Sequence, residues 1–72
     1  MNTKYTATLT DGTEVRFGSK HLKTHVVEVT SDGTPGILSR HGSLALAEKA
    51  ARSARNRPDI WTNVHILPVR PA

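Results

Sequence analysis

The sequence predicts a small α+β domain, in which a mostly antiparallel sheet carries one helix packed on one face. Three observations predict this fold. Alternating apolar and polar residues surround an Asp-Gly turn signal twice, within residues 4–19 and 24–41. An alanine-rich amphipathic stretch follows at residues 43–57, and an extended run begins at Ile60. We therefore expect residues 1–72 to form a single domain of two hairpins, one helix and a C-terminal strand.

The first hairpin turns at Asp11-Gly12, where two loop lengths give different registers. A two-residue loop would place Leu9 opposite Glu14 and mix apolar with polar residues on each face. A three-residue loop of residues 10–12, with Gly12 in the left-handed conformation, gives pairs that share one apolar face. Those pairs are Leu9 with Thr13, Ala7 with Val15, and Tyr5 with Phe17. We therefore expect the three-residue loop.

The second hairpin turns at Asp32-Gly33, and its second strand contains Pro35 and Gly36. Proline cannot donate a hydrogen bond to a sheet ladder. This strand is therefore expected at an edge of the sheet or in an irregular conformation.

The helix is expected to begin after Ser43, a good N-cap residue, and to end before Pro58. At 100° per residue its alanines and Leu46 fall on one arc, while Lys49 and Arg52 lie opposite. Glu48 is spaced to pair with Arg52. The predicted core draws apolar side chains from all elements: Leu9, Val15, Phe17, Val27, Val29, Ile37, Leu46, Ala47, Ala50, Ala51, Ala54, Val64 and Ile66.

The last strand is expected to run from Ile60 to Val69 and to be ended by Pro68 and Pro71. Simple alternation places Val64 and Ile66 on one side of this strand, with Ile60. It places Trp61 and Leu67 on the other side, with Asn63 and His65. Trp61 is either a core residue or an exposed contact for a partner. On the alternating pattern, this second side is a candidate protein interface.

Composition narrows the class of protein. Only 36% of residues are apolar and three are aromatic, so the core is thin and a homodimer would add burial. The absence of cysteine excludes disulfides, thiol catalysis and zinc sites that need thiolate. No apolar run approaches the ~20 residues of a membrane span, and the start does not resemble a secretion signal. We therefore expect a soluble cytoplasmic protein with no membrane partner.

The net charge of +4 is concentrated in the second half of the chain. Residues 1–39 are neutral overall, and the whole excess lies in residues 40–72. Clustered cations are what phosphate binding requires, although arginines on a helix face are more often simply solvated. The sequence therefore offers a basic edge as a candidate contact for a nucleic acid or a partner: Arg40, Lys49, Arg52 and Arg55, with Arg57 and Arg70 nearby.

Two histidine-containing motifs are weak candidates for chemistry. His21 and His25 are four residues apart, but their segment reads as extended and no carboxylate completes a metal site. Ser39, His41 and Ser43 place hydroxyls near an imidazole, yet nucleophilic catalysis also needs an orienting group and an oxyanion hole. We therefore expect no catalytic residues, no bound metal, no cofactor and no enzymatic activity.

Two segments carry a resemblance to a known group of proteins. Residues 5–15 (YTATLTDGTEV) and 20–29 (KHLKTHVVEV) resemble small uncharacterised accessory proteins of actinobacteriophages, including mycobacteriophage-like proteins, which share a TxxDGT turn and a THVV strand. The chain departs from that pattern at Thr10, where proline is usual, and at Leu22, where an aromatic residue is common. Residues 39–55 and 64–69 are similar to the strand-helix-strand unit of small actinobacterial domains.

The resemblance implies a nonstructural phage protein acting in the host cytoplasm, and it carries over no catalytic residue. With the sequence features, it leads to the hypothesis of a noncatalytic protein that binds a host macromolecule, chiefly a host protein. The alternative is a DNA- or RNA-binding protein that uses the basic edge of the helix at residues 43–57. The tentative contact residues are Arg40, Lys49, Arg52, Arg55 and Trp61.

Overall fold

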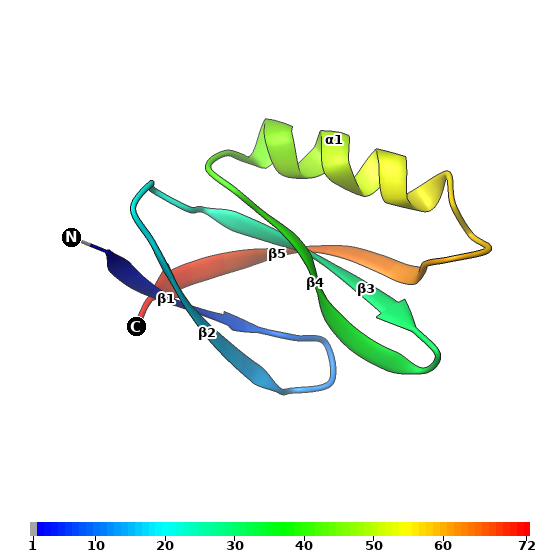
Figure 1. The fold of residues 1–72 in the computed structure, drawn as a ribbon, viewed down its shortest axis with the longest axis horizontal. Coiled ribbons are helices and arrows are strands. Elements are labelled where there is room, and N and C mark those ends of the chain that lie inside the picture. The colour runs from blue at the N-terminus through cyan, green and yellow to red at the C-terminus, as the bar shows by residue number, and fades with distance from the viewer. Residues whose placement is uncertain (1) are drawn as a thin grey trace.

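A computed structural model describes residues 2–72 and shows one five-stranded sheet with one helix over one of its faces (Figure 1). The strand order is β2-β1-β5-β3-β4, and each neighbouring pair is antiparallel. The α+β fold expected from the sequence is therefore confirmed. The elements are β1 (Thr3–Thr8), β2 (Glu14–Ser19), β3 (His25–Ser31), β4 (Thr34–His41), α1 (Leu44–Arg55) and β5 (Thr62–Pro71).

The first hairpin has the three-residue loop that the apolar pattern favoured. The Leu9 N–H donates to the Thr13 carbonyl at 2.8 Å, and Gly12 has a φ of 92°. A carboxylate oxygen of Asp11 accepts from the Thr13 N–H at 2.9 Å, and this bond lowers the pKa of Asp11. The resulting register places Tyr5 opposite Phe17, as expected.

The second hairpin turns through Asp32 and Gly33, whose φ values are 52° and 78°. Two left-handed residues in a row are typical of the two-residue turn that matches the twist of antiparallel strands. Strand β4, which contains Pro35, is the outermost strand on its side of the sheet. Its expected position at an edge is confirmed.

Strand β5 joins the two hairpins into one sheet. Its first part pairs with β3, as far as the match of His25 with Pro68, and its last part pairs with β1 through residues 69–71. The expectation that Pro68 ends the strand is wrong. Pro68 lies where the strand passes from one partner to the other, and the Val69 N–H donates to the Thr24 carbonyl at 3.0 Å. Proline is tolerated at such an interruption of a ladder.

A bulge near the start of β5 changes which side chains share a face. Glu28 pairs with His65 and Thr30 with Thr62, so β5 uses one residue more than β3 over this interval. Asn63 has a left-handed φ of 51° there. Because side chains alternate between the two faces of a sheet, one extra residue moves every preceding side chain to the opposite face. Trp61 therefore packs on the helix side of the sheet with Val64 and Ile66, and its expected place beside Leu67 is wrong.

The helix covers one face of the sheet with a row of alanines. Ala47, Ala51 and Ala54 are buried against Val27 and Val29 of β3. The Ser43 side chain accepts from the Leu46 N–H at 3.2 Å, which confirms the N-cap.

Leu46 was expected in the core but is 54% exposed, so that assignment is wrong. The buried arc is centred near Ala47, and Leu46 lies about 100° around the helix from it. Ile60 was expected inside the last strand; it lies before β5 and is also exposed.

On the other face, the sheet curls so that side chains of the first hairpin pack against those of β3. Tyr5, Ala7, Phe17 and Val26 form a second buried cluster there, with Leu67 partly buried against it. The rings of Tyr5 and Phe17 stack with centroids 5.5 Å apart. Val26 was not in the predicted core, because that prediction buried only the face of this strand that carries Val27 and Val29. The sheet therefore has a core on each side.

Glu28 is a fully buried carboxylate that ties the two hairpins together. Its oxygens accept from the Thr10 N–H at 2.8 Å and from the Thr10 hydroxyl at 2.9 Å. A buried polar group is stable only when it is hydrogen-bonded, and Thr10 meets that need from the first turn. The contact anchors the first turn to the middle of β3.

Candidate functional site

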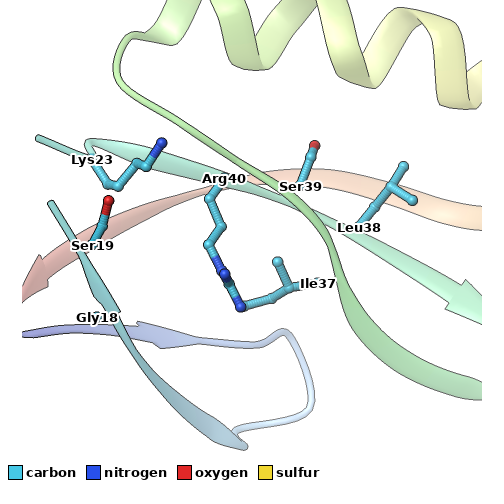
Figure 2. Close-up of a pocket in the computed structure, with 7 residues that line it drawn as sticks. All are labelled: Gly18, Ser19, Lys23, Ile37, Leu38, Ser39 and Arg40. Carbon is cyan, nitrogen blue, oxygen red and sulfur yellow. The ribbon is translucent and has the colours of Figure 1, made fainter. Parts of the chain in front are cut away.

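A groove lies between the two outer strands of the sheet, β2 and β4 (Figure 2). The sheet is curled, so these strands face each other although they stand at opposite ends of the strand order. The groove has a volume of about 470 Å³. It is lined by Gly18 and Ser19 of β2, Lys23 of the connection to β3, and Ile37, Leu38, Ser39 and Arg40 of β4.

Arg40 is the most prominent side chain of the groove. Figure 2 shows it extending from β4 into the space between the strands, and its guanidinium carbon lies 4.7 Å from the centre of the Phe17 ring. A cation over an aromatic face is attracted by the ring's negative potential. No carboxylate of residues 2–72 lies within 4.0 Å of this guanidinium. The fold therefore holds a cation at the groove and leaves its charge uncompensated.

The Tyr5 hydroxyl also holds the backbone of Lys23, the residue that carries the second cation of the groove. The Lys23 N–H donates to the Tyr5 hydroxyl at 3.2 Å, which ties the connection after β2 to β1. A second cavity of about 550 Å³ adjoins β2 and is lined by Lys4, Arg16, Phe17, Gly18 and Ala72. None of the side chains that line either cavity is acidic. Four cationic side chains therefore line the two cavities beside β2: Lys4, Arg16, Lys23 and Arg40.

Ser39 and His41 form a hydrogen-bonded pair at the end of the groove. The Ser39 hydroxyl lies 2.7 Å from Nε2 of His41. Burial lowers the pKa of His41, and the charge of Lys23 lowers it further. The tautomer of the imidazole decides which of the two groups donates this bond, and in residues 2–72 no side-chain hydrogen bond orients Nδ1 of His41. Ser43, the second hydroxyl of this motif, caps α1 instead.

The two histidines considered as metal ligands do not share a helix. His21 lies in the connection before β3, and Nδ1 of His25 lies 2.8 Å from the Thr24 hydroxyl. The described part of the chain contains no group of three potential ligands from histidine, cysteine, aspartate or glutamate.

The basic edge expected from the sequence is divided between the two sides of the sheet. Arg40 contacts the cluster under the first hairpin, whereas Lys49, Arg52 and Arg55 belong to the helix on the other side. Arg55 donates to the Val64 carbonyl at 3.2 Å. Lys49 and Arg52 are exposed, so the structure brings together the helix cations but not Arg40 with them.

Ion pairs involve other residues than the sequence suggested. Within residues 2–72 the pairs closer than 4.0 Å are Arg57 with Asp59, at 3.9 Å, and Arg70 with Glu14, at 3.1 Å. The expected pair of Glu48 with Arg52 is not formed. Arg57 and Arg70 are thereby partly neutralised, which leaves the helix cations and the groove as two separate basic regions.

Sequence reasoning identified Arg40 but assigned it to the wrong group of cations. It missed Lys23 and Gly18 as members of a site with Arg40, because no local pattern shows that β2 and β4 face each other. The one available signal was Pro35, which marked β4 as an edge strand.

Among residues 2–72, the single helix is too short to span a bilayer. The chain has no significant match among protein-family models, curated proteins or solved structures.

Proposed function

We propose that this chain is a noncatalytic accessory protein that binds a host protein, and that it acts in the host cytoplasm during phage infection. The observation that carries the proposal is the groove between β2 and β4. It combines two unpaired strand edges, the partly exposed Leu38 and the uncompensated charge of Arg40. An exposed strand edge is a ready template for pairing with another chain.

A protein partner suits this groove better than a nucleic acid does. Its wall contains apolar side chains, Ile37 and Leu38, between the cations. The aromatic rings of Tyr5 and Phe17 are buried and stacked on each other, so they offer no exposed platform for bases. Apolar contact with backbone pairing is a common mode of peptide recognition.

A site-specific crosslinking experiment tests the proposal. The chain has no cysteine, so Leu38→Cys places one thiol in the groove and Ser53→Cys places one on the exposed side of the helix as the matched control. Each variant is labelled with a photoreactive maleimide and exposed to an actinobacterial lysate, with and without nuclease. We expect one host protein to be captured from the groove position alone and to survive nuclease. Equal capture from both positions would contradict the proposal.

Nucleic-acid binding by the helix is a second candidate, favoured by one observation. Lys49, Arg52 and Arg55 all lie on the helix, and among residues 2–72 none of them has an ion-pair partner. If the helix binds DNA or RNA, affinity should fall steeply as salt rises. Each of Lys49→Ala and Arg52→Ala should reduce the slope of log K against log salt by about one.

Arg40→Ala is the control for this second candidate because Arg40 lies on the other side of the sheet. It should leave the salt slope unchanged if the helix is the contact. A slope that responds equally to Arg40→Ala and Arg52→Ala would indicate only nonspecific attraction to the whole positive chain.

A further inference from the structure

We infer that the groove accepts an extended acidic segment of the partner protein as a sixth strand, paired to the edge of β2. This inference rests on the proposed function and specifies how its partner is bound. It follows from the direction of the strands, from the backbone groups that β2 and β4 offer for pairing, and from the charge of the groove.

The direction of the strands suits one added strand. All neighbours in the order β2-β1-β5-β3-β4 are antiparallel, so β2 and β4 run in the same direction. Few of their Cα atoms approach within 8 Å, whereas paired strands stand about 4.7–4.9 Å apart. One strand that runs opposite to both would be antiparallel to each. A strand added in that direction would therefore continue the antiparallel arrangement of the sheet.

The edge of β2 presents regular backbone groups to that strand. The Thr13 carbonyl accepts from the N–H opposite it at 2.8 Å, and bonded and non-bonded pairs alternate along an antiparallel ladder. Val15 and Phe17 therefore direct their backbone groups toward β1. Arg16 and Gly18 direct theirs outward, and Gly18 lines the groove.

The edge of β4 is less suited to pairing. Pro35 has no N–H to donate, and the register between β3 and β4 shifts at a bulge. Prolines and bulges are devices that protect an edge from pairing. Strand β2 contains no proline, and its register with β1 is continuous from Glu14 to Ser19. We therefore assign the backbone pairing to β2, while β4 supplies side-chain contacts.

The charge of the groove selects an acidic occupant. Arg40 and Lys23 line it, and no carboxylate of residues 2–72 lies within 4.0 Å of either charge. Lys4 and Arg16 line the adjoining cavity. A basic segment would be repelled at each of these positions. Since side chains alternate along a strand, carboxylates at every second position would face Arg40 from one side of the added strand.

Selection from a random octapeptide display library tests the inference directly. We expect enrichment of peptides with Asp or Glu at alternate positions. Arg40→Gln should weaken a selected peptide roughly tenfold, as for the loss of one charge-assisted hydrogen bond. Arg52→Gln, on the opposite side of the sheet, is the matched control and should have no effect. Selected peptides without acidic residues, or equal sensitivity to both variants, would overturn the inference.

The pairing itself is tested at Gly18. Gly18→Pro removes the outward N–H, whereas Gly18→Ala retains it and places a Cβ no closer than 3.7 Å to Asn2. We expect the proline variant to lose peptide binding and the alanine variant to keep it. Hydrogen exchange of the wild-type protein provides a second readout, which does not depend on the folding of the proline variant. The Arg16 and Gly18 amides should become protected when a selected peptide binds, and unchanged exchange would overturn the pairing.

Two results separate this inference from the function on which it rests. A host protein crosslinked from Leu38→Cys, together with no acidic octapeptide selected, would retain the function and reject the added strand.

A second copy of this chain is the competing occupant. A homodimer in sedimentation equilibrium that Gly18→Pro dissociates would assign the β2 edge to self-association and overturn the acidic segment.

Discussion

The residue whose role differs most from its sequence context is Glu28. It stands in the apolar run of residues 26–29, yet its carboxylate is fully buried and bound by Thr10 from the first turn. A buried carboxylate without partners would be strongly unfavourable. Glu28 therefore makes the fold depend on the correct position of a turn 18 residues earlier.

Glu28→Ala should destabilise the protein by about 3 kcal/mol, because it leaves a cavity and removes the acceptor of the Thr10 N–H. Glu28→Gln retains an oxygen for that N–H and should cost about 1 kcal/mol, the value of charge assistance in the bond. Urea denaturation measures both changes. Glu48→Ala, on the exposed side of the helix, is the control and should stay within about 0.5 kcal/mol. An equal effect of Glu28→Ala and Glu48→Ala would contradict the anchoring role.

His41 should make stability depend on pH. Its pKa in the folded chain is lowered from 6.5, by burial and then by Lys23. The unfolded chain therefore takes up the proton first, and protonation favours unfolding. The contribution of His41 to stability is fully present above pH 6.5 and is lost as pH falls below it. His41→Gln should flatten the curve of stability against pH in this window, as measured by urea denaturation at several pH values. An unchanged curve would show that another group is responsible.

At the scale of the element, the last strand shows where simple alternation fails. Thr62 to Pro71 contains a bulge and a change of partner, and both fall where the sequence shows only an asparagine and a proline. The bulge brings Trp61 to the helix side with Val64 and Ile66. A single extra residue thus moves the only tryptophan from the interface expected by simple alternation to the packing beneath the helix.

The left-handed backbone at Asn63 provides a test of the bulge. Asn63→Val should destabilise the protein by about 1–2 kcal/mol, because a side chain branched at Cβ strains a positive φ. Asn63→Gly relieves that strain and serves as the matched control. The emission of Trp61 reports the local structure and should shift toward that of exposed indole in the valine variant alone. Equal stability of both variants would indicate that the strand has no left-handed residue at this position.

At the scale of the whole molecule, β5 is the element that makes one fold from two hairpins. It contacts β3 along most of its length but β1 through only three residue pairs, Tyr5 with Pro71, Thr6 with Arg70 and Ala7 with Val69. Further contacts of the first hairpin are the Glu28 bonds to Thr10, the cluster around Phe17, the Arg70–Glu14 ion pair and the bond from the Lys23 N–H to the Tyr5 hydroxyl. The first hairpin is therefore joined to the sheet less extensively than the second.

Native-state hydrogen exchange should reveal this difference. The amides of β3, which has a strand on each side, should show the largest protection, close to the free energy of global unfolding. The amides of β2 that bond to β1 should exchange faster, through an opening that releases the first hairpin. Equal protection of β2 and β3 would show that the sheet opens only as a whole.

The division of charge between the two sides of the sheet also belongs to this scale. Arg40 and the helix cations look like one basic region in the sequence because they lie within residues 40–55. The helix packs on one side and Arg40 reaches Phe17 on the other. Adjacent positions in a chain need not share a surface when a sheet lies between them.

The sequence alone determined the local structure of this protein. Turn residues with special backbone angles, Gly12 and Gly33, and the N-cap Ser43 act through their immediate neighbours. The register of the first hairpin, the turn of the second, the helix and the position of β4 at an edge could therefore be predicted. The alanine side of the helix followed from the same local periodicity.

Only the tertiary structure decided which surfaces meet. The bulge at Asn63, the passage of β5 across Pro68 and the burial of Glu28 depend on partners distant in the chain. The groove likewise exists because the curl of five strands brings β2 opposite β4. Such contacts depend on how whole elements pack together. The free energy of that packing comes from residues far apart in the chain, so no short segment predicts it. For this reason the candidate site could not be predicted although most of its elements could.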